Sequence, residues 1–488
     1  VHYYDPHFPY DPPEPYRQRY AKDGYAGEVA YTDELIGRLL KSLLRQGLQG
    51  NTLIVILSDH GESLGEHGEE THGVFLYDST MHIPFIMAGP GLPEGQVVAQ
   101  QVRSIDLMPS ILDYLGISAG EQVQGTTLLP AMTDGKRVRT DYAYMETLYP
   151  KTHMGWSELR AMRTDDWKLV VAPRPELYRL SSDRDESRNI IDDHSREADR
   201  LRQRVQEIAG AESQGDIEYE AMDEETLKQL QALGYVSAGK ARNLQFDFSG
   251  PDPKDRVQVL QTLDRATDLM NHDRFAAAAP LLEKIVSQDP SNPLLYQQLG
   301  VCLQETGEFS KALQVYKRAV ENKADTDRTH AEIGEIHIRF GDLGRAIESM
   351  EHAADLNPSN LDNFSNLANA YLQSRRLNDA EGAVGAIFAQ DPDHAGGHNL
   401  MGLIMIHSGR SALARSHFQQ AIQSNPDSAE PYMNLGLLAQ QSNQPELALG
   451  YYKSFVERAG DQPQFREIVP KVKAAIADLD SLMAQRSR

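Results

Sequence analysis

The stretch SDHGESLGEHG gathers side chains that can bind a metal ion and transfer protons. Asp59 and His60 directly follow the apolar run TLIVIL, and His67 and His72 lie in the same loop. A carboxylate and an imidazole are metal ligands, and a metal ion between them would act as a Lewis acid and orient a charged substrate. An isolated Asp-His pair would more often be a helix cap beside a hydrogen-bonded histidine. The additional histidines, together with His7 in DPHFPYDPP, favour a metal site.

The elements around this loop predict an α/β region. EVAYTDELIGRLLKSLLRQG has leucines at helical spacing and ends at Gly47, so it predicts a long amphipathic helix. TLIVIL predicts a central buried strand, IPFIMAG a second strand, and SIDLMPSILDYLG a helix entered by Ser104 or Asp106. DWKLVVAP and PELYRLSSD predict a later hairpin. Open α/β sheets place their sites at the C-terminal ends of strands, which is where the loop lies.

A succession of motifs in residues 1–189 resembles the back half of a sulfatase, a family of the alkaline phosphatase superfamily. The motifs are HYYDPHFPYDPP, YAGEVAYTDELIGRLL, NTLIVILSDHGESLGEHG, THGVFLYDSTMHIPFIMAGPG, SIDLMPSILDYLGI and WKLVVAPRPELYRLSSDRDESRNI. Their order makes the resemblance more specific than any single motif would. It implies hydrolysis of a sulfate ester at a single divalent metal ion, within an incomplete sulfatase-like domain that covers residues 1–205.

The resemblance assigns roles to individual residues. Asp59 and His60 match the second pair of metal ligands. His7 matches the substrate-facing histidine of the family's PHxP motif, and His72 lies near a second sulfate-contacting or leaving-group-protonating residue. The expected site is therefore His7 and His72 for catalysis and Asp59 and His60 for the metal. His67 has no counterpart and is expected to be a solvated loop histidine.

These roles suit the chemistry, because a sulfate monoester needs positive charge on its nonbridging oxygens and a proton for the departing alkoxide. The identity of the metal stays open. Most of the family uses calcium and many members have Asn at the position of His60, whereas an imidazole suits manganese, zinc or iron better.

Sulfatases also carry a paired-aspartate metal motif early in the chain, and a C-x-P-x-R or S-x-P-x-R nucleophile motif whose Cys or Ser is oxidised to formylglycine. Neither motif occurs in these 488 residues, and the single cysteine, Cys302, lies in an expected repeat helix without the Pro and Arg. We therefore expect the formylglycine nucleophile upstream of Val1, and we expect this chain alone to be inactive. The full-length protein is expected to be periplasmic or exported.

A second part of the chain repeats with a period of 34 residues. Small residues recur at Ala266, Gly300, Gly334, Ala368, Gly402 and Gly436, and alanines follow twelve positions later at Ala278, Ala312, Ala346, Ala380, Ala414 and Ala448. The spacing resembles the tetratricopeptide repeat (TPR), a helix-turn-helix unit. It predicts an all-α solenoid of six repeats over residues 257–460 and a capping helix within 461–488. An acidic linker with a short helix is expected over 206–256.

The concave face of such a solenoid usually carries its function. The expected inward positions give a mixed set without lysine, namely Gln297, Arg328, Glu335, Arg339, Asn369, Asn399 and His407. This set matches a basic carboxylate clamp poorly. A protein or peptide partner of unspecified sequence is therefore predicted.

Composition excludes some classes of partner. A formal net charge of −23 argues against nucleic acid, which requires a basic face. No apolar run approaches the roughly 18 residues of a membrane span, so no transmembrane segment is expected in this chain.

Two other functions stay open. One is a phosphodiester or phosphonate hydrolase, or a phosphoethanolamine-type transferase, because these members of the superfamily also carry DHG. The nucleophile would discriminate between them and a sulfatase. The other is a non-catalytic TPR binding scaffold, which would leave the gathering of His7, Asp59, His60 and His72 unexplained.

Overall fold

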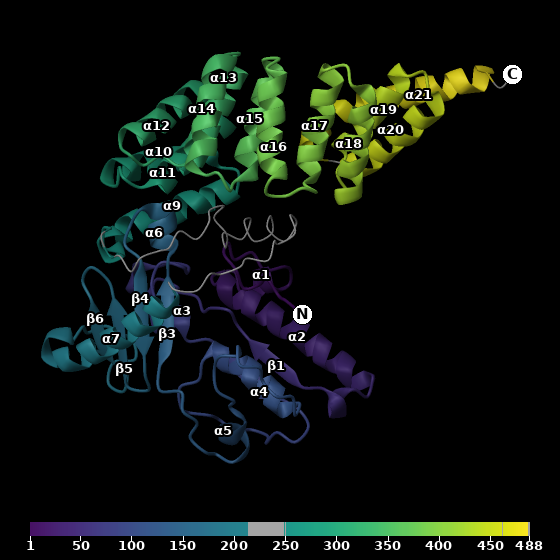
Figure 1. The fold of residues 1–488 in the computed structure, drawn as a ribbon. Helices are drawn as coiled ribbons and strands as arrows, with labels where there is room; N and C mark the ends of the chain where they lie inside the picture. Colours follow the sequence, from purple (N-terminus) through teal and green to yellow (C-terminus); the bar gives the residue numbers. More distant parts are fainter. Residues whose placement is uncertain (213–247, 249, 461, 487–488) are drawn as a thin grey trace. The chain divides into compact units, whose positions relative to one another are not determined.

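The computed structural model describes residues 1–212, 248, 250–460 and 462–486 (Figure 1). Within these residues the chain forms two compact units, which divide between Glu308 and Phe309. The first unit contains a mixed α/β region and the helices that follow it up to residue 308. The second unit is entirely helical. The expected fold class, an α/β region followed by a helical repeat region, is confirmed.

The predicted long helix of the α/β region is α2. The helices of this region are α1 (Tyr16–Arg19), α2 (Gly24–Arg45), α3 (Asp78–Met81), α4 (Leu107–Tyr114), α5 (Leu129–Thr133), α6 (Tyr149–Met154) and α7 (Ser195–Glu212), with 3-10 turns η1 (Gln49–Asn51), η2 (Glu66–Gly68), η3 (Ser104–Asp106) and η4 (Ile191–His194). The side chain of Asp23 caps α2 by accepting a hydrogen bond from the backbone N–H of Ala26. Gly47 follows α2 with a φ of +70°, a conformation that glycine adopts without strain.

The strand before the DHG motif lies in a two-stranded sheet. β1 (Ile54–Leu57) pairs antiparallel with β2 (Phe85–Ala88), so that Ile54 faces Ala88 and Leu57 faces Phe85. The expectation of a central buried strand is wrong, because β1 has one paired neighbour in the described residues and all four of its residues are only partly buried. The expectation rested on the apolar composition of TLIVIL, which does not report how many neighbours a strand has.

A second sheet forms the core of the α/β region. Its strands are β3 (Ala143–Thr147), β4 (Leu159–Arg163), β5 (Trp167–Val171) and β6 (Glu176–Arg179), in the order β3-β4-β5-β6 with antiparallel pairing throughout. β5 and β6 are the predicted hairpin. Met162, Leu169 and Leu177 of this sheet pack with Leu201 and Val205 of α7, all of them fully buried.

The first helices of the repeat region belong to the same compact unit as the α/β region. They are η5 (Pro253–Arg256), α9 (Val257–Asn271), α10 (Phe275–Gln288) and α11 (Pro293–Glu305). The buried indole of Trp156 donates a hydrogen bond to Asp289, at 2.7 Å. A Cβ on Gly68 would lie 2.3 Å from Cγ1 of Val257. These contacts place the first repeat helices against η2 of the DHG loop and against the segment between α6 and β4.

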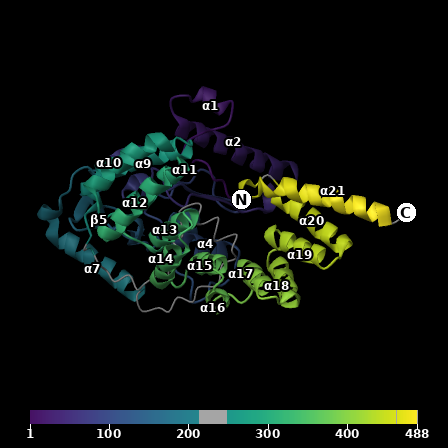
Figure 2. The ribbon, with the colours of Figure 1, turned by 90° about the horizontal axis from the view of Figure 1, so that it is seen from above.

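The second unit consists of helix pairs followed by a long C-terminal helix (Figure 2). Its elements are α12 (Phe309–Glu321), α13 (Asp327–Arg339), α14 (Leu343–Leu356), α15 (Leu361–Gln373), α16 (Leu377–Phe388), α17 (Ala395–His407), α18 (Ser411–Ser424), α19 (Glu430–Gln441), α20 (Pro445–Ala459), η6 (Pro463–Phe465) and α21 (Ile468–Arg486). The periodic glycines are packing positions, because a Cβ on Gly402 would lie 2.4 Å from the ring of Phe418 and one on Gly436 would lie 2.5 Å from Tyr452. Cys302 of α11 is fully buried, as expected.

Most of the predicted acidic linker, residues 213–247 and 249, lies outside the described residues. α7 continues to Glu212 and so passes residue 205, where the catalytic region was expected to end. Among the helices that the structure describes, none is both long enough and apolar enough to cross a bilayer.

Candidate functional site

The loop after β1 is held close to α3 by a glycine. The backbone N–H of Gly61 donates a hydrogen bond to the carbonyl of Thr80, at 2.7 Å. A Cβ at position 61 would lie 2.5 Å from the carbonyl oxygen of Ser79, so a larger residue would push the loop away. The glycine of the DHG motif therefore fixes where the two preceding side chains, Asp59 and His60, can lie.

His60 is oriented by a backbone carbonyl. Its Nδ1 lies 2.8 Å from the carbonyl oxygen of Gly61, which can only accept, so Nδ1 carries the proton. The lone pair of the neutral ring is then on Nε2, which lies 3.8 Å from Oδ2 of Asp59. Burial opposes ionisation of Asp59, but the charge of His60 and backbone hydrogen bonds outweigh it and lower the pKa of that carboxyl. The pair therefore offers one imidazole nitrogen and one carboxylate oxygen that lie 3.8 Å apart.

His72 lies against His60 and is paired with a buried carboxylate. The two rings have centroids 4.0 Å apart, and Nδ1 of His72 donates to Oε1 of Glu62 at 3.0 Å. Burial would lower the pKa of His72, but the hydrogen bond and charge of Glu62, helped by Glu69 and Asp59, outweigh it and raise the pKa. The charged, proton-donating form of His72 is thus more stable than that of a free imidazole.

His7 reaches the same place from the N-terminal segment. Its ring centroid lies 5.6 Å from that of His72, in an edge-to-face arrangement. The segment is fixed by Glu28 of α2, whose buried carboxylate accepts hydrogen bonds from the backbone N–H groups of His7 and Asp11, at 3.0 and 2.7 Å. Burial, with smaller effects from the charges of His72 and His60, lowers the pKa of His7.

The structure therefore brings together the four residues that were predicted from the sequence. His7 from the N-terminal segment and His60 and His72 from the loop between β1 and α3 form a cluster of rings, and Asp59 lies beside His60. Their catalytic and metal-binding roles stay predictions.

The donor set fits a divalent metal ion in part. Asp59 and His60 would supply two ligands, and the hydrogen bond from Nδ1 of His60 to a carbonyl is the usual outer contact of a metal-binding histidine. Among the described residues, the group with three ligand atoms close enough to share one ion lies elsewhere, at Asp325, His330 and His352 of the second unit.

Sequence reasoning missed the two carboxylates that hold this cluster. Glu62 lies two residues after His60 and its side chain is only 5% exposed, so its position in the loop was a usable signal. Glu28 lies on α2, and no local pattern connects it with His7.

A buried ion cluster fixes α3 beneath the loop. Lys168 of β5 is fully buried and contacts the carboxylates of Asp78 and Glu186, both at 2.7 Å. Arg163 contacts Asp78 as well, at 3.0 Å. Because α3 begins at Asp78 and provides the carbonyl that holds Gly61, this cluster supports the loop from below.

His67 does not join the cluster. Its ring stacks on Tyr77, with centroids 3.6 Å apart and planes 14° from parallel, and burial lowers its pKa. The expectation of a solvated loop histidine is wrong, because the turn at η2 folds the ring inward onto the buried tyrosine.

Comparison with protein families divides the chain in the same way. Residues 1–117 match the Sulfatase family model, and residues 65–211 match the model described as N-sulphoglucosamine sulphohydrolase, C-terminal. Residues 269–331, 337–404 and 407–463 match tetratricopeptide repeat models.

Curated relatives are sulfatases. Arylsulfatase K from Homo sapiens is 25% identical over 231 residues, which are 46% of this chain and 43% of that protein. N-acetylglucosamine-6-O-sulfatase from Bacteroides thetaiotaomicron is 32% identical over 185 residues, which are 36% of this chain and 32% of that protein. The chain thus spans less than half the length of these curated relatives.

Two solved structures match parts of the chain. MamA is 21% identical with a TM-score of 0.29, and the match covers 33% of this chain and 94% of MamA. BT4656, described in complex with its substrate D-glucosamine-2-N,6-O-disulfate, is 28% identical with a TM-score of 0.35, and the match covers 40% of this chain and 41% of that one. From the family and relative matches, the α/β region of this chain is homologous to arylsulfatases, and the helical region that follows consists of tetratricopeptide repeats.

Proposed function

We propose that the whole protein hydrolyses sulfate esters with the help of one divalent metal ion, and that this chain carries the C-terminal part of its catalytic domain. The observation that carries the proposal is the convergence of His7, His60 and His72 beside Asp59. These side chains suit a sulfate monoester, whose hydrolysis develops negative charge on the sulfate and on the departing oxygen.

Asp59 and His60 would hold the metal ion. Bound there, the ion would supply Lewis-acid stabilisation of the anionic ester. The Nδ1 contact with the Gly61 carbonyl keeps Nε2 of His60 as the ligand atom. Because one ligand is an imidazole, manganese, zinc or iron suits the pair better than the calcium that most of the family uses.

His72 is the proposed proton donor. Glu62 holds its ring and favours the imidazolium, so its Nε2–H is available for the leaving-group oxygen or for a sulfate oxygen. His7 is the proposed sulfate-binding residue. Its Nδ1 lies 2.6 Å from the carbonyl of Phe8, so its Nε2 is the nitrogen that remains for substrate. An adjacent sulfate anion would favour the protonated ring, whose Nε2–H then donates to the ester.

We further propose that residues beyond this chain supply the nucleophile and the remaining metal ligands. The 488 residues contain neither C-x-P-x-R nor S-x-P-x-R, and the 231 residues that match the human relative cover 43% of its length. The chain by itself is therefore predicted to be inactive.

The test compares this chain with a longer polypeptide that begins at the start codon of its gene. We expect the longer protein to hydrolyse 4-nitrophenyl sulfate and the 488-residue chain to be silent. In the longer protein His72→Ala and Asp59→Ala should each lower kcat/KM by roughly 100-fold or more, and His82→Ala, an exposed histidine after α3, should not. Hydrolysis of a 4-nitrophenyl phosphodiester or phosphonate in place of the sulfate would overturn the substrate class. Turnover by the short chain would overturn the proposal on the nucleophile.

The repeat region is proposed to bind a protein or peptide on its concave face. The mixed polar side chains at the predicted inward positions support a partner that is recognised through hydrogen bonds. Within the chain, Asn399 accepts a hydrogen bond from Asn434 at 2.9 Å. A peptide array probed with the full chain tests this proposal. If a peptide binds on the concave face, Asn369→Ala should bind it more weakly, while nonspecific binding to other peptides of the array should stay unchanged.

A further inference from the structure

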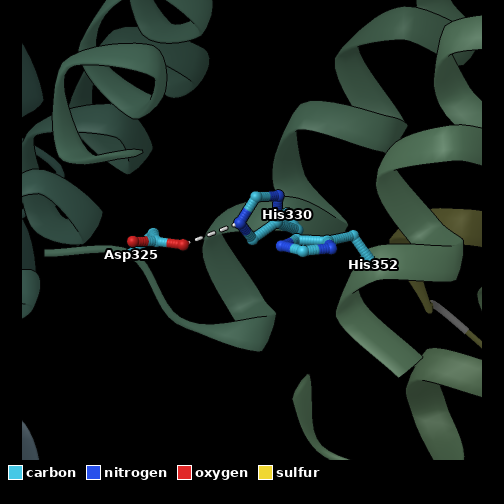
Figure 3. A group of neighbouring side chains, drawn as sticks. All are labelled: Asp325, His330 and His352. Carbon is cyan, nitrogen blue, oxygen red and sulfur yellow. Dashed lines mark hydrogen bonds and ion pairs between the residues drawn. The ribbon is translucent and has the colours of Figure 1, made fainter. Parts of the chain in front are cut away.

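A second group of ligand-type side chains lies in the helical unit, far along the sequence from the DHG loop. Asp325 lies in the connection between α12 and α13, His330 in the first turn of α13, and His352 near the end of α14. Figure 3 shows the ring of His330 between the other two side chains, facing Asp325 on one side and His352 on the other.

The distances bring three ligand atoms into one small volume. Nε2 of His330 lies 2.9 Å from Oδ2 of Asp325, and the ring centroids of His330 and His352 are 4.3 Å apart. One ligand atom from each residue lies within 4.8 Å of the others. Around a tetrahedral zinc ion the ligand atoms are roughly 3.4 Å apart, so modest side-chain rotations would complete the geometry.

The residues at the position of His330 in other repeats show whether packing alone explains this histidine and its two partners. At the position of His330, three other repeats have an aromatic residue, namely Tyr296, Phe364 and Tyr432. His330 is 9% exposed, so an imidazole there can be explained as a substitute for a packed ring. Packing does not explain the partners, because His352 is exposed and Asp325 only half buried.

The repeat two units later provides an internal contrast. His398 and Asp393 stand 68 positions after His330 and Asp325, but the position that corresponds to His352 is Gln420. His398 instead lies 3.2 Å from His417, nitrogen to nitrogen. In the part of the chain that the structure describes, the three-ligand group occurs at Asp325, His330 and His352 and not at this later repeat.

We propose that Asp325, His330 and His352 form a binding site for a divalent transition-metal ion of the zinc class. Two imidazoles and one carboxylate are ligands that zinc accepts, whereas magnesium and calcium prefer sites made of oxygen atoms alone. Three protein ligands leave a fourth position for water or for a side chain of a bound partner. The exposed edge at His352 gives the ion a route from solvent.

Metal binding at this site would clamp one repeat. The ligands come from α14, from α13 and from the connection that precedes α13, so a bound ion would tie the N-terminal end of α13 to the C-terminal end of α14. Because the ion binds the folded repeat and not the unfolded chain, it would stabilise the helical unit in proportion to the logarithm of its concentration.

The test counts zinc ions bound to the full 488-residue chain by equilibrium dialysis, at matched pH and ionic strength. The DHG loop can also bind metal, so the informative quantity is the difference between variants. We expect His352→Ala and His330→Phe to bind one zinc ion fewer than the unaltered chain, or to bind it at least roughly tenfold more weakly. His330→Phe introduces the residue of the next repeat and so preserves the packed ring.

His417→Ala is the matched control, since it removes a histidine from the second helix of a repeat without touching the proposed ligands. Cobalt added in place of zinc gives a second readout. His352→Ala should lose the part of the visible absorption that comes from the ion at His330 and His352, and Asp59→Ala should keep that part. Equal zinc stoichiometry and affinity in the unaltered chain, His352→Ala and His330→Phe would overturn the proposal, as would loss of the ion in His417→Ala to the same extent.

Discussion

The two histidine clusters of this protein are built in opposite ways. In the α/β region His7 comes from the N-terminal segment and His60 and His72 come from the loop between β1 and α3, and their positions depend on buried carboxylates and on a glycine contact. In the helical unit Asp325, His330 and His352 lie within 28 consecutive residues on one helix pair. The cluster of the α/β region needs many long-range polar contacts. The group in the helical unit needs only different side chains on the helix pair that every repeat forms.

This difference can be measured because both tryptophans of the chain, Trp156 and Trp167, lie in the first unit. Tryptophan fluorescence therefore reports unfolding of that unit. Far-UV circular dichroism is dominated by the helices and reports mainly the repeat region.

The largest effect is expected when the support under the DHG loop is broken. Lys168→Met leaves the buried carboxylate of Glu186 without its cation and leaves Asp78 with Arg163 alone, which costs about 3–5 kcal/mol. The fluorescence-detected urea transition should move to lower concentration while most of the helical signal persists. Lys136→Met, at an exposed ion pair, is the control and should leave both transitions in place. Equal loss of both signals in Lys168→Met would contradict the separation of the two regions.

The next effect concerns the N-terminal segment. Glu28→Ala leaves the backbone N–H groups of His7 and Asp11 without their acceptor, at a cost of about 1–3 kcal/mol. We expect faster hydrogen exchange over residues 5–11 by mass spectrometry and little change in the repeats. Glu34→Ala, on the exposed part of the same helix, serves as the comparison. Unchanged exchange in that segment would show that Glu28 does not hold it.

The stability of the helical unit should depend on which glycine is replaced by alanine. Gly402→Ala brings a Cβ against the ring of Phe418 and should destabilise the helical unit by about 1–3 kcal/mol. Gly382→Ala, in helix α16 with open space around the new Cβ, should stabilise it by about 0.5–1 kcal/mol. Thermal unfolding followed by circular dichroism distinguishes the two variants. Shifts of their melting temperatures in the same direction would refute the interpretation of the periodic glycines as packing positions.

The smallest effect is a change in pH dependence. Burial, with the charge of Glu70, raises the pKa of Asp264 on α9 to about 7. Because the folded-state pKa lies above the unfolded value, the associated stability is complete below the unfolded pKa and is lost as the pH rises through about 7. Between pH 6 and pH 8 this loss is about 1 kcal/mol.

Asp264→Asn should therefore flatten the pH dependence of the fluorescence-detected transition between pH 6 and 8. Asp268→Asn, four residues further along α9 and partly exposed, should keep the original slope. A slope that is identical in the unaltered chain and in Asp264→Asn would show that this carboxyl does not titrate with folding.

Sequence reasoning succeeded where contacts are local or periodic. The helix pairs follow from the 34-residue period, and the hairpin of β5 and β6 follows from two adjacent apolar runs. The central position expected for β1 failed, because an apolar run does not reveal how many strands lie beside it.

The candidate sites show the same limit. Motif resemblance brought His7, Asp59, His60 and His72 into one hypothesis, but Glu28 was missed since its contact with His7 spans 21 residues without a local pattern. The ligand group around His330 was missed as well. The 34-residue period identifies packing positions only. Whether the side chains of His330 and His352 face each other depends on how the two helices of one repeat pack, which the period does not report.

The docking of the first repeat onto the α/β region has a consequence for how such a protein can be divided or recombined. A gene fragment that ended before residue 250 would lose Asp289, the partner of the Trp156 indole, and Val257, which covers Gly68. A domain exchange at the acidic linker would therefore uncover the contacts of Trp156 and Gly68. We expect exchange of repeat helices to be better tolerated after α11, with the first three repeat helices kept together with the α/β region.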